Sequence, residues 1–223
     1  DAGKYQIIKD TNTYYFTDLM YENKNNHFVD VSKSLGLNNK AFGLSAIIND
    51  FNQDGFPDVY VCNDYQAPDY LYLNEKAKRF VDKQDQYFGN QSHSSMGSYI
   101  SDFNNDGKLD FYVTDMMPQE NQRIKSMMTY INYDKQTLAA QFGYGDQFKY
   151  NSFQVANENN TYSNVAFGTD LSSTDWSWNV IGEDFNCDGE NDLFITNGYI
   201  FEASIDMDYS FYRLDSLKKI GNK

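Results

Sequence analysis

Three nine-residue stretches of the chain concentrate the side chains that are best suited to bind a metal ion. They read DFNQDGFPD at 50–58, DFNNDGKLD at 102–110 and DFNCDGEND at 184–192, and are here called loops 1, 2 and 3. Each carries Asp or Asn at positions 1, 3, 5 and 9 and glycine at position 6. Oxygen ligands at alternate positions, with glycine at the sharp turn, form the front of a calcium loop of the EF-hand type. The spacing therefore predicts a cation site in each loop.

The predicted ligands are the side-chain oxygens at positions 1, 3, 5 and 9 and the backbone carbonyl at position 7. Because position 7 contributes only a carbonyl, its side chain is free to vary. A set of hard oxygen ligands favours Ca²⁺ over Zn²⁺, while Mg²⁺ prefers to keep several waters. We expect about three structural Ca²⁺ ions. The ligand sets are Asp50, Asn52, Asp54, Phe56 and Asp58; Asp102, Asn104, Asp106, Lys108 and Asp110; and Asp184, Asn186, Asp188, Glu190 and Asp192.

The loops also differ from an EF-hand. An EF-hand has a bidentate Glu at position 12, whereas these loops have Val61, Val113 and Ile195 there. The aspartate at position 9 is therefore expected to act as the closing carboxylate. The alternative is an Asx turn in which aspartates cap backbone amides without a metal. Three copies with matching flanks favour the calcium interpretation.

The flanks of the loops predict the elements that position them. Runs such as LSAII and DVYVCND are rich in β-branched and aromatic residues, which is typical of strands. Looser strand pairs follow, so each unit is expected to be a blade-like antiparallel sheet of about four short strands. The predicted class is all-β, with blades at roughly 14–62, 70–115 and 151–197.

The interval between loops 2 and 3 is longer than that between loops 1 and 2, which indicates an insertion at 116–150. Its many Gln, Lys, Met and Ala residues favour two short helices, and Pro118 suits a first helical turn. A helical tail is expected at 208–221.

Composition excludes several classes of protein. The net charge of −14 argues against a nucleic-acid partner or an anionic membrane surface. We expect no transmembrane segment, because no apolar run approaches the length of a membrane helix. His27 and His93 stand outside any catalytic motif, so an enzyme is not expected. Cys62 and Cys187 are expected to be unpaired thiols.

The pattern DFNxDGxxD between strands resembles the FG-GAP/VCBS repeat of integrin-type β-propellers. The stretches VTDMMPQENQRIKSMM, NYDKQ and TDWSWNVIGEDFNCDGENDLFITNGY are similar to the cartilage acidic protein (ASPIC/UnbV-associated) branch, in its bacterial surface-protein form. The resemblance implies propeller blades with Ca²⁺ in the inter-strand loops, held by the residues named above. Such rings usually have about seven blades. Residues 1–223 are therefore expected to be a single partial propeller domain, completed by remaining blades of a longer chain.

The predicted function is a non-catalytic, calcium-binding scaffold for binding or adhesion, exported or displayed on a cell surface and associated with a bacterial outer membrane. Its partner would be a protein or a glycan at that surface. One alternative is a glycan-binding, lectin-like module that uses Trp176 and Trp178. Another is a structural subunit of an outer-membrane surface complex, docked through the Met-rich insertion. A carbohydrate-active enzyme is the least favoured reading.

Overall fold

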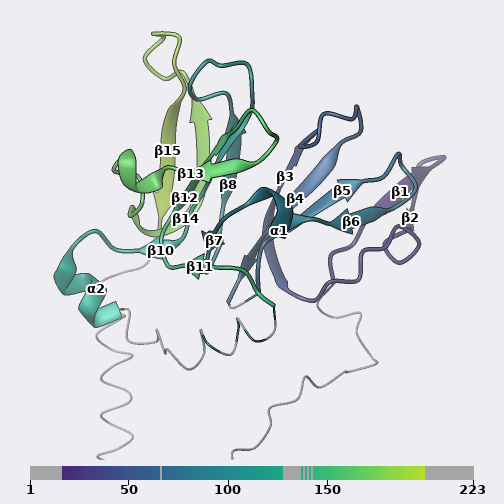
Figure 1. Cartoon of the computed structure of the whole chain (residues 1–223), viewed down its shortest axis with the longest axis horizontal. Helices are drawn as coiled ribbons and strands as arrows, with labels where there is room; N and C mark the ends of the chain where they lie inside the picture. Colours follow the sequence, from purple (N-terminus) through teal and green to yellow (C-terminus); the bar gives the residue numbers. More distant parts are fainter. Residues whose placement is uncertain are drawn as a thin grey trace, which may run out of the picture.

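A computed structural model describes residues 17–65, 67–127, 137, 139, 141 and 143–198. Three antiparallel sheets stand side by side, with the first sheet on the right of Figure 1 and the third on the left. The described chain is mostly strand with two short α-helices, which confirms the all-β class and the propeller-like blades.

The first sheet follows the chain in the order β3-β4-β5-β6. Its side chains alternate between two faces, because successive residues of a strand point to opposite sides. Ile47 and Tyr60, which are paired across β3 and β4, face the second sheet. Val59 and Val61 face the other way. The strands are β3 (Phe42–Asn49), β4 (Asp58–Asp64), β5 (Tyr70–Asn74) and β6 (Phe80–Asp82).

The second sheet has the order β13-β12-β9-β8 and is interrupted in sequence by the insertion. β12 pairs with β9 through Phe153 and Tyr112, although a long segment separates the two strands in the chain. The insertion therefore leaves the sheet and returns to the same edge. The strands are β8 (Ser98–Ser101), β9 (Asp110–Val113), β12 (Ser152–Ala156) and β13 (Tyr162–Asn164).

The third sheet has the order β10-β14-β15 among the described residues. Its strands are β10 (Met116–Met117), β14 (Asp175–Glu183) and β15 (Asp192–Asn197). Two smaller sheets complete the set. One is the hairpin of β1 (Tyr21–Lys24) and β2 (His27–Asp30), and the other pairs β7 (Gln91–Ser92) with β11 (Gln147–Phe148) in parallel.

This pairing groups the strands differently from the expected blade ranges 14–62, 70–115 and 151–197. The first and second sheets each begin with the strand before an aspartate loop, continue after that loop and end with the following hairpin. The hairpin 152–164 therefore belongs to the second sheet, and the hairpin 21–30 stands apart from the first. The sequence showed the strand pairs but gave no sign of which neighbour each pair joined.

The insertion begins and ends as strand, at β10 and β11, and carries α2 (Asn121–Met127). One of the two expected helices is thus present, a few residues after Pro118. Most of the second expected helix and the tail at 208–221 lie outside the described residues. The other helices are α1 (Gln84–Tyr87) and a 3₁₀ turn at Ala166–Gly168. Within the described part of the chain, no helix is long and apolar enough to cross a membrane.

Aromatic side chains fill the spaces between neighbouring sheets. Tyr60 and Phe111 lie with ring centroids 4.8 Å apart between the first and second sheets. Tyr112 and Phe153 lie 5.9 Å apart on the other side of the second sheet, in the cluster that includes Val180 of the third. The second sheet therefore packs on the first sheet with one face and on the third with the other. In each sheet, the face turned in the direction of the next sheet along the chain is here called the forward face, and the opposite face is called the backward face.

Two buried carboxylates hold the segment that connects the first and second sheets. Asp69 accepts hydrogen bonds from the Tyr60 hydroxyl at 2.5 Å and the Ser95 hydroxyl at 2.7 Å. Asp115 accepts the backbone N–H groups of His93 and Ser94, both at 3.1 Å. Burial raises the pKa of each carboxyl to about 7, because it disfavours the charged form. These two acids therefore link the blades through groups that titrate near neutrality.

Candidate metal centres

The three aspartate loops occupy the same place in their sheets. Loop 1 joins β3 to β4, loop 2 joins β8 to β9, and loop 3 joins β14 to β15. All three project from the same end of the molecule, at the top of Figure 1. Position 9 is the first residue of the second strand in every case. The strands thus fix both ends of each loop, as the flanking sequence predicted.

The side chains at positions 1 and 3 converge on one backbone group. In loop 1, Asp50 and Asn52 each accept the N–H of Asp54 at 3.0 Å. The other oxygen of Asp50 accepts the N–H of Gly55 at 2.7 Å. The same bonds recur in loop 2 and in loop 3, with lengths from 2.8 to 3.1 Å. Convergence of these oxygens is what a small, highly charged cation requires.

Position 5 adds a third oxygen-bearing side chain to the same turn. Asp54, Asp106 and Asp188 each accept the N–H of their position-7 residue at 2.9 Å. The amides of Asn52 and Asn104 also donate to the aspartate at position 5 of their own loop. The loop hydrogen bonds therefore already draw positions 1, 3 and 5 together.

Two residues of each loop adopt left-handed backbone conformations. Gly55 has φ of 88°, and its equivalents in loops 2 and 3 have 87° and 93°, as the glycine at position 6 predicted. Position 4 is also left-handed, with φ of 59° at Gln53, 58° at Asn105 and 61° at Cys187. Of these three residues, only Asn105 could be expected from the sequence to have a left-handed backbone, because Asn tolerates this conformation better than Gln or Cys.

The aspartate at position 9 is held differently from the others. Asp58 is fully buried, and its two oxygens accept the N–H of Phe51 at 2.9 Å and of Asn74 at 2.7 Å. Asp110 is equally buried and accepts the N–H groups of Phe103 and Ala156. Burial raises the pKa of both carboxyls, and the N–H bonds lower it in part. A carboxylate has about four lone-pair sites, so a donor on each oxygen leaves room for a cation.

Among the described residues, Asp192 of loop 3 accepts only the first of these two bonds. Its carboxylate accepts the N–H of Phe185 at 3.1 Å. In loops 1 and 2, the second donor comes from the hairpin that follows in the same sheet. The third sheet has no such hairpin among the described residues. Within the part of the chain that the structure describes, loop 3 is therefore anchored on one side.

The donor set of each loop suits Ca²⁺, because it consists of carboxylate and amide oxygens. In the part of the chain that the structure describes, no Lys or Arg forms an ion pair with a loop aspartate, and Lys108 pairs with Glu158 instead. No group of three or more His, Cys, Asp or Glu side chains among these residues forms a metal cluster by itself. Binding in a loop would thus also draw on the asparagine oxygen and the carbonyl at position 7, as the sequence analysis predicts.

The histidines and tryptophans singled out in the sequence lie outside the loops, whereas Cys187 is position 4 of loop 3. His27 is exposed on β2, and the His93 ring nitrogen Nδ1 lies 3.1 Å from the Ser94 hydroxyl. Trp176 is partly buried, whereas Trp178 is 46% exposed beside Gly198. Cys62 is buried and Cys187 exposed, and both are free thiols, as expected.

Sequence reasoning missed the role of position 2. Phe occupies it in every loop, and its N–H donates to the aspartate at position 9. Phe51 is also packed between the first and second sheets, with only 3% of its surface exposed. The Phe at position 2 of all three loops is the feature of the sequence that could have indicated this role.

Comparison with known families agrees with this arrangement. Residues 50–113 match the model of the FG-GAP-like repeat. The match contains loops 1 and 2, the strand after each loop and the strand before loop 2. It supports a repeat of the FG-GAP family, whose modules are of the propeller type and generally non-catalytic. No curated protein matches the chain.

Proposed function

We propose that the chain is a calcium-stabilised segment of a β-propeller that serves as a binding or adhesion scaffold outside the cell. The observation that carries the proposal is the hydrogen-bond pattern shared by the three loops. In each, the oxygens at positions 1, 3 and 5 are drawn to one turn. None of the ion pairs among the described residues involves a loop aspartate. The FG-GAP-like match adds the family context.

Ca²⁺ would act as a structural ion in this function. In loop 1 the residues that would hold it are Asp50, Asn52, Asp54, Asp58 and the carbonyl of Phe56, with the equivalent residues in loops 2 and 3. A bound divalent cation offsets the repulsion among neighbouring carboxylates. It would thereby fix the turn that joins the two inner strands of each blade. Extracellular calcium modules bind at about 10⁻⁴–10⁻³ M, which suits the proposed location.

We further propose that the chain belongs to one branch of this family. The insertion and the stretch TDWSWNVIG favour the cartilage acidic protein branch, in its bacterial surface-protein form. On this assignment the protein is displayed at an outer membrane, and further blades of a longer chain complete the ring.

The test is thermal unfolding of the full chain in excess Ca²⁺ and in chelator. Free Ca²⁺ at 100 times Kd should stabilise by about 2.7 kcal/mol per site. Asp106→Ala should reduce the calcium-dependent part of the stability. Asp85→Ala, which lies in α1 outside every loop, is the matched control and should preserve it. Equal melting temperatures with Ca²⁺ and with chelator would reject the proposal in favour of metal-free Asx turns.

A further inference from the structure

Among the described residues, a single side chain joins two of the aspartate loops by hydrogen bonds. Asn191, at position 8 of loop 3, donates through Nδ2 to the Ser101 hydroxyl at 2.7 Å and to the backbone carbonyl of Asp102 at 3.5 Å. Asp102 is position 1 of loop 2, and Ser101 is the last residue of β8 before it. Figure 1 shows loops 2 and 3 as neighbours at the top left, with loop 1 farther to the right. Loops 2 and 3 are therefore in direct contact.

Asn191 stands between two predicted ligands of its own loop. In the chain, Glu190 at position 7 precedes it and Asp192 at position 9 follows it. The Asn191 side chain is half-buried, so its bonds to loop 2 are partly shielded from water. Among the described residues, Asp192 accepts one N–H group, whereas Asp58 and Asp110 each accept two. The contact with loop 2 is thus an additional anchor for this half of loop 3.

The strands that lead into these two loops also approach each other closely. Gly182, which lies two residues before loop 3, faces the side chain of Tyr99 on β8, and a Cβ at this glycine would overlap the tyrosine ring. Tyr99 in turn contacts Phe103, at position 2 of loop 2, with ring centroids 6.1 Å apart. The N–H of Phe103 donates to Asp110 at 3.3 Å. The packing between the two strands therefore reaches the closing carboxylate of loop 2.

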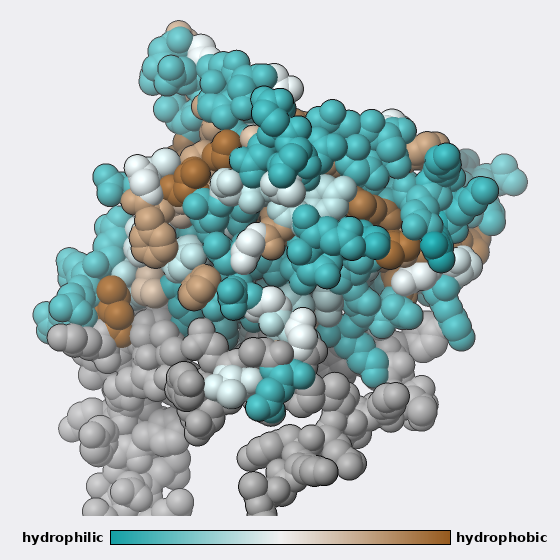
Figure 2. Space-filling model, in the orientation of Figure 1, coloured by the Kyte–Doolittle hydropathy of each residue, from teal (hydrophilic) through white to brown (hydrophobic). Residues whose placement is uncertain are grey.

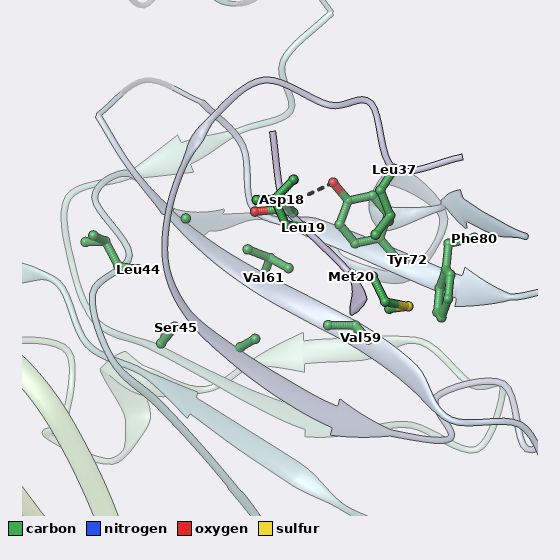
Figure 3. Close-up of a pocket in the computed structure, with 12 residues that line it drawn as sticks. Asp18, Leu19, Met20, Leu37, Leu44, Ser45, Val59, Val61, Tyr72 and Phe80 are labelled. Atoms are coloured by element: carbon green, nitrogen blue, oxygen red, sulfur yellow. Dashed lines mark hydrogen bonds between the residues drawn. The ribbon is translucent and has the colours of Figure 1, made fainter. Parts of the chain in front are cut away.

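Loop 1 has no contact like that of Asn191 in the part of the chain that the structure describes. Its position 8 is Pro57, which has no side-chain donor. Leu193, which follows position 9 of loop 3, packs in the cluster shared by the second and third sheets. Val59 follows position 9 of loop 1 and instead lines a cavity of about 340 Å³ beside residues 18–20 (Figure 3). On the side where loop 3 meets loop 2, loop 1 therefore adjoins a cavity.

Loops 1 and 2 are linked through the core and not through their turns. Phe51, at position 2 of loop 1, packs on Phe111 with ring centroids 6.0 Å apart, and both rings are buried. No hydrogen bond among the described residues joins the two loops. Buried rings are held by the close-packed core whether or not an exposed turn binds an ion. Loop 1 is thus an internal reference for the contact between loops 2 and 3.

We propose that loops 2 and 3 bind Ca²⁺ cooperatively through Asn191, while loop 1 binds independently. This inference rests on the proposed calcium function and adds a coupling between two of its sites. An ion in loop 2 fixes the backbone of Asp102 and hence the acceptors that Asn191 uses. Asn191 then holds positions 7 and 9 of loop 3, so that less conformational entropy is lost when the second ion binds. Coupling between sites is reciprocal, so an ion in loop 3 favours binding in loop 2 by the same factor.

The charges of the loops limit the repulsion between the two ions. Loop 3 has four acidic side chains, so one Ca²⁺ leaves it with negative charge. Loop 2 has three aspartates, and its Lys108 pairs with Glu158. The surface at the top of Figure 2, where the loops project, is mostly hydrophilic, and physiological salt screens exposed charges beyond about 8 Å. We therefore expect the ordering effect to exceed the repulsion.

Calcium titration of the full chain, followed by NMR of isotopically labelled glycine, tests the coupling. The N–H groups of Gly55, Gly107 and Gly189 each donate to position 1 of their own loop, so each reports on one site. Asp106→Ala in loop 2 should raise the calcium concentration at half-saturation of Gly189 about three- to tenfold, the range expected for one hydrogen bond. Asp54→Ala, the same change in loop 1, is the matched control and should leave the Gly189 midpoint unchanged.

Asn191→Ala gives the decisive comparison, because it removes the donor and keeps every predicted ligand. Alone, it should raise the midpoints of both Gly107 and Gly189. In its background, Asp106→Ala should no longer shift Gly189. Leu109→Ala, at position 8 of loop 2, is the control and should leave the three midpoints unchanged.

The possible failures have different meanings. If the loop glycines do not respond to Ca²⁺, the calcium function itself is rejected, and the coupling with it. If all three loops saturate but Asp106→Ala leaves the Gly189 midpoint unchanged or lowers it, the coupling is wrong and the calcium function stands. A shift that persists in the Asn191→Ala background would overturn the role of Asn191. Should Asp106→Ala fail to fold, Ser101→Ala, which removes the nearer acceptor, must raise the same two midpoints as Asn191→Ala, or the proposal is wrong.

Discussion

Asp58 in loop 1 and Asp192 in loop 3 hold the same position in the same motif, yet their surroundings differ. Asp58 is fully buried and receives N–H groups from its own loop and from β5. Asp192 is partly exposed and receives one N–H, from Phe185. The motif therefore determines the turn, while the neighbouring strands determine how firmly the turn is held. The next residue of the same face repeats the contrast, since Tyr60 is buried and Phe194 is exposed.

Truncating the aromatic residue of β4 or β15 should give the largest difference between the two regions. Tyr60→Ala removes a buried ring and the hydroxyl bonded to Asp69, so we expect a loss of about 3–5 kcal/mol in the free energy of unfolding. Phe194→Ala should cost less than about 1 kcal/mol. Urea denaturation at low protein concentration measures both. Equal losses would show that the forward face of the third sheet is covered as the first is.

Removing the position-9 aspartate should give the next largest difference. Asp58→Ala leaves two N–H groups unsatisfied at a buried site, at a cost of about 1–3 kcal/mol each. Asp192→Ala exposes one N–H near solvent and should cost clearly less. Comparing the two in chelator separates this effect from any loss of calcium. If Asp192→Ala proved as costly, loop 3 would have the second anchor that the described residues lack.

The contact between the first and second sheets should depend on pH. Burial raises the pKa of Asp69 to about 7 in the folded chain, whereas an unfolded Asp titrates near 3.9. Because the pKa of Asp69 is higher in the folded chain than in the unfolded chain, the protonated carboxyl contributes to the free energy of unfolding. This contribution is fully present below the unfolded pKa and is lost as the pH rises through about 7. Stability should therefore fall between about pH 4 and pH 7.

The matched variant for this prediction is Asp69→Asn, which keeps an acceptor but cannot ionise. Its denaturation midpoint should vary less with pH than that of the parent chain. Asp115 should retain its own share of the dependence, because burial raises its pKa in the same direction. An unchanged pH profile in Asp69→Asn would remove Asp69 as a source of the dependence.

The smallest expected effect distinguishes loops 2 and 3 at position 4. Asn105 and Cys187 have left-handed backbones with φ of 58° and 61°. Since Asn tolerates this region better than Cys, Cys187→Asn should stabilise the chain by up to about 1 kcal/mol. Asn105→Cys should lose a similar amount. Thermal unfolding of both variants measures these changes. A lower stability of Cys187→Asn or a higher stability of Asn105→Cys would contradict the left-handed backbone at position 4.

Much of the fold was predictable because its signals are local. Alternating aromatic and β-branched residues identified the inner strands, and the glycine at position 6 required a left-handed turn that Gly55 adopts. The free thiols were also expected from the spacing of Cys62 and Cys187. In contrast, the grouping of strands into sheets was not visible, because the hairpin 152–164 returns to β9 across a long insertion.

The candidate metal sites were likewise predictable from the sequence in part. By itself the sequence determined three oxygen-rich turns between strands, since their residue types and spacing constrain the local backbone directly. Whether these turns bind Ca²⁺ stays a prediction. Only the tertiary structure decided that Asp58 is buried and accepts two N–H groups while Asp192 accepts one from the described residues, and that Tyr60 is covered while Phe194 is exposed. The reason is physical: burial and second hydrogen-bond donors come from neighbouring strands, and the motif contains no information about which strands those are.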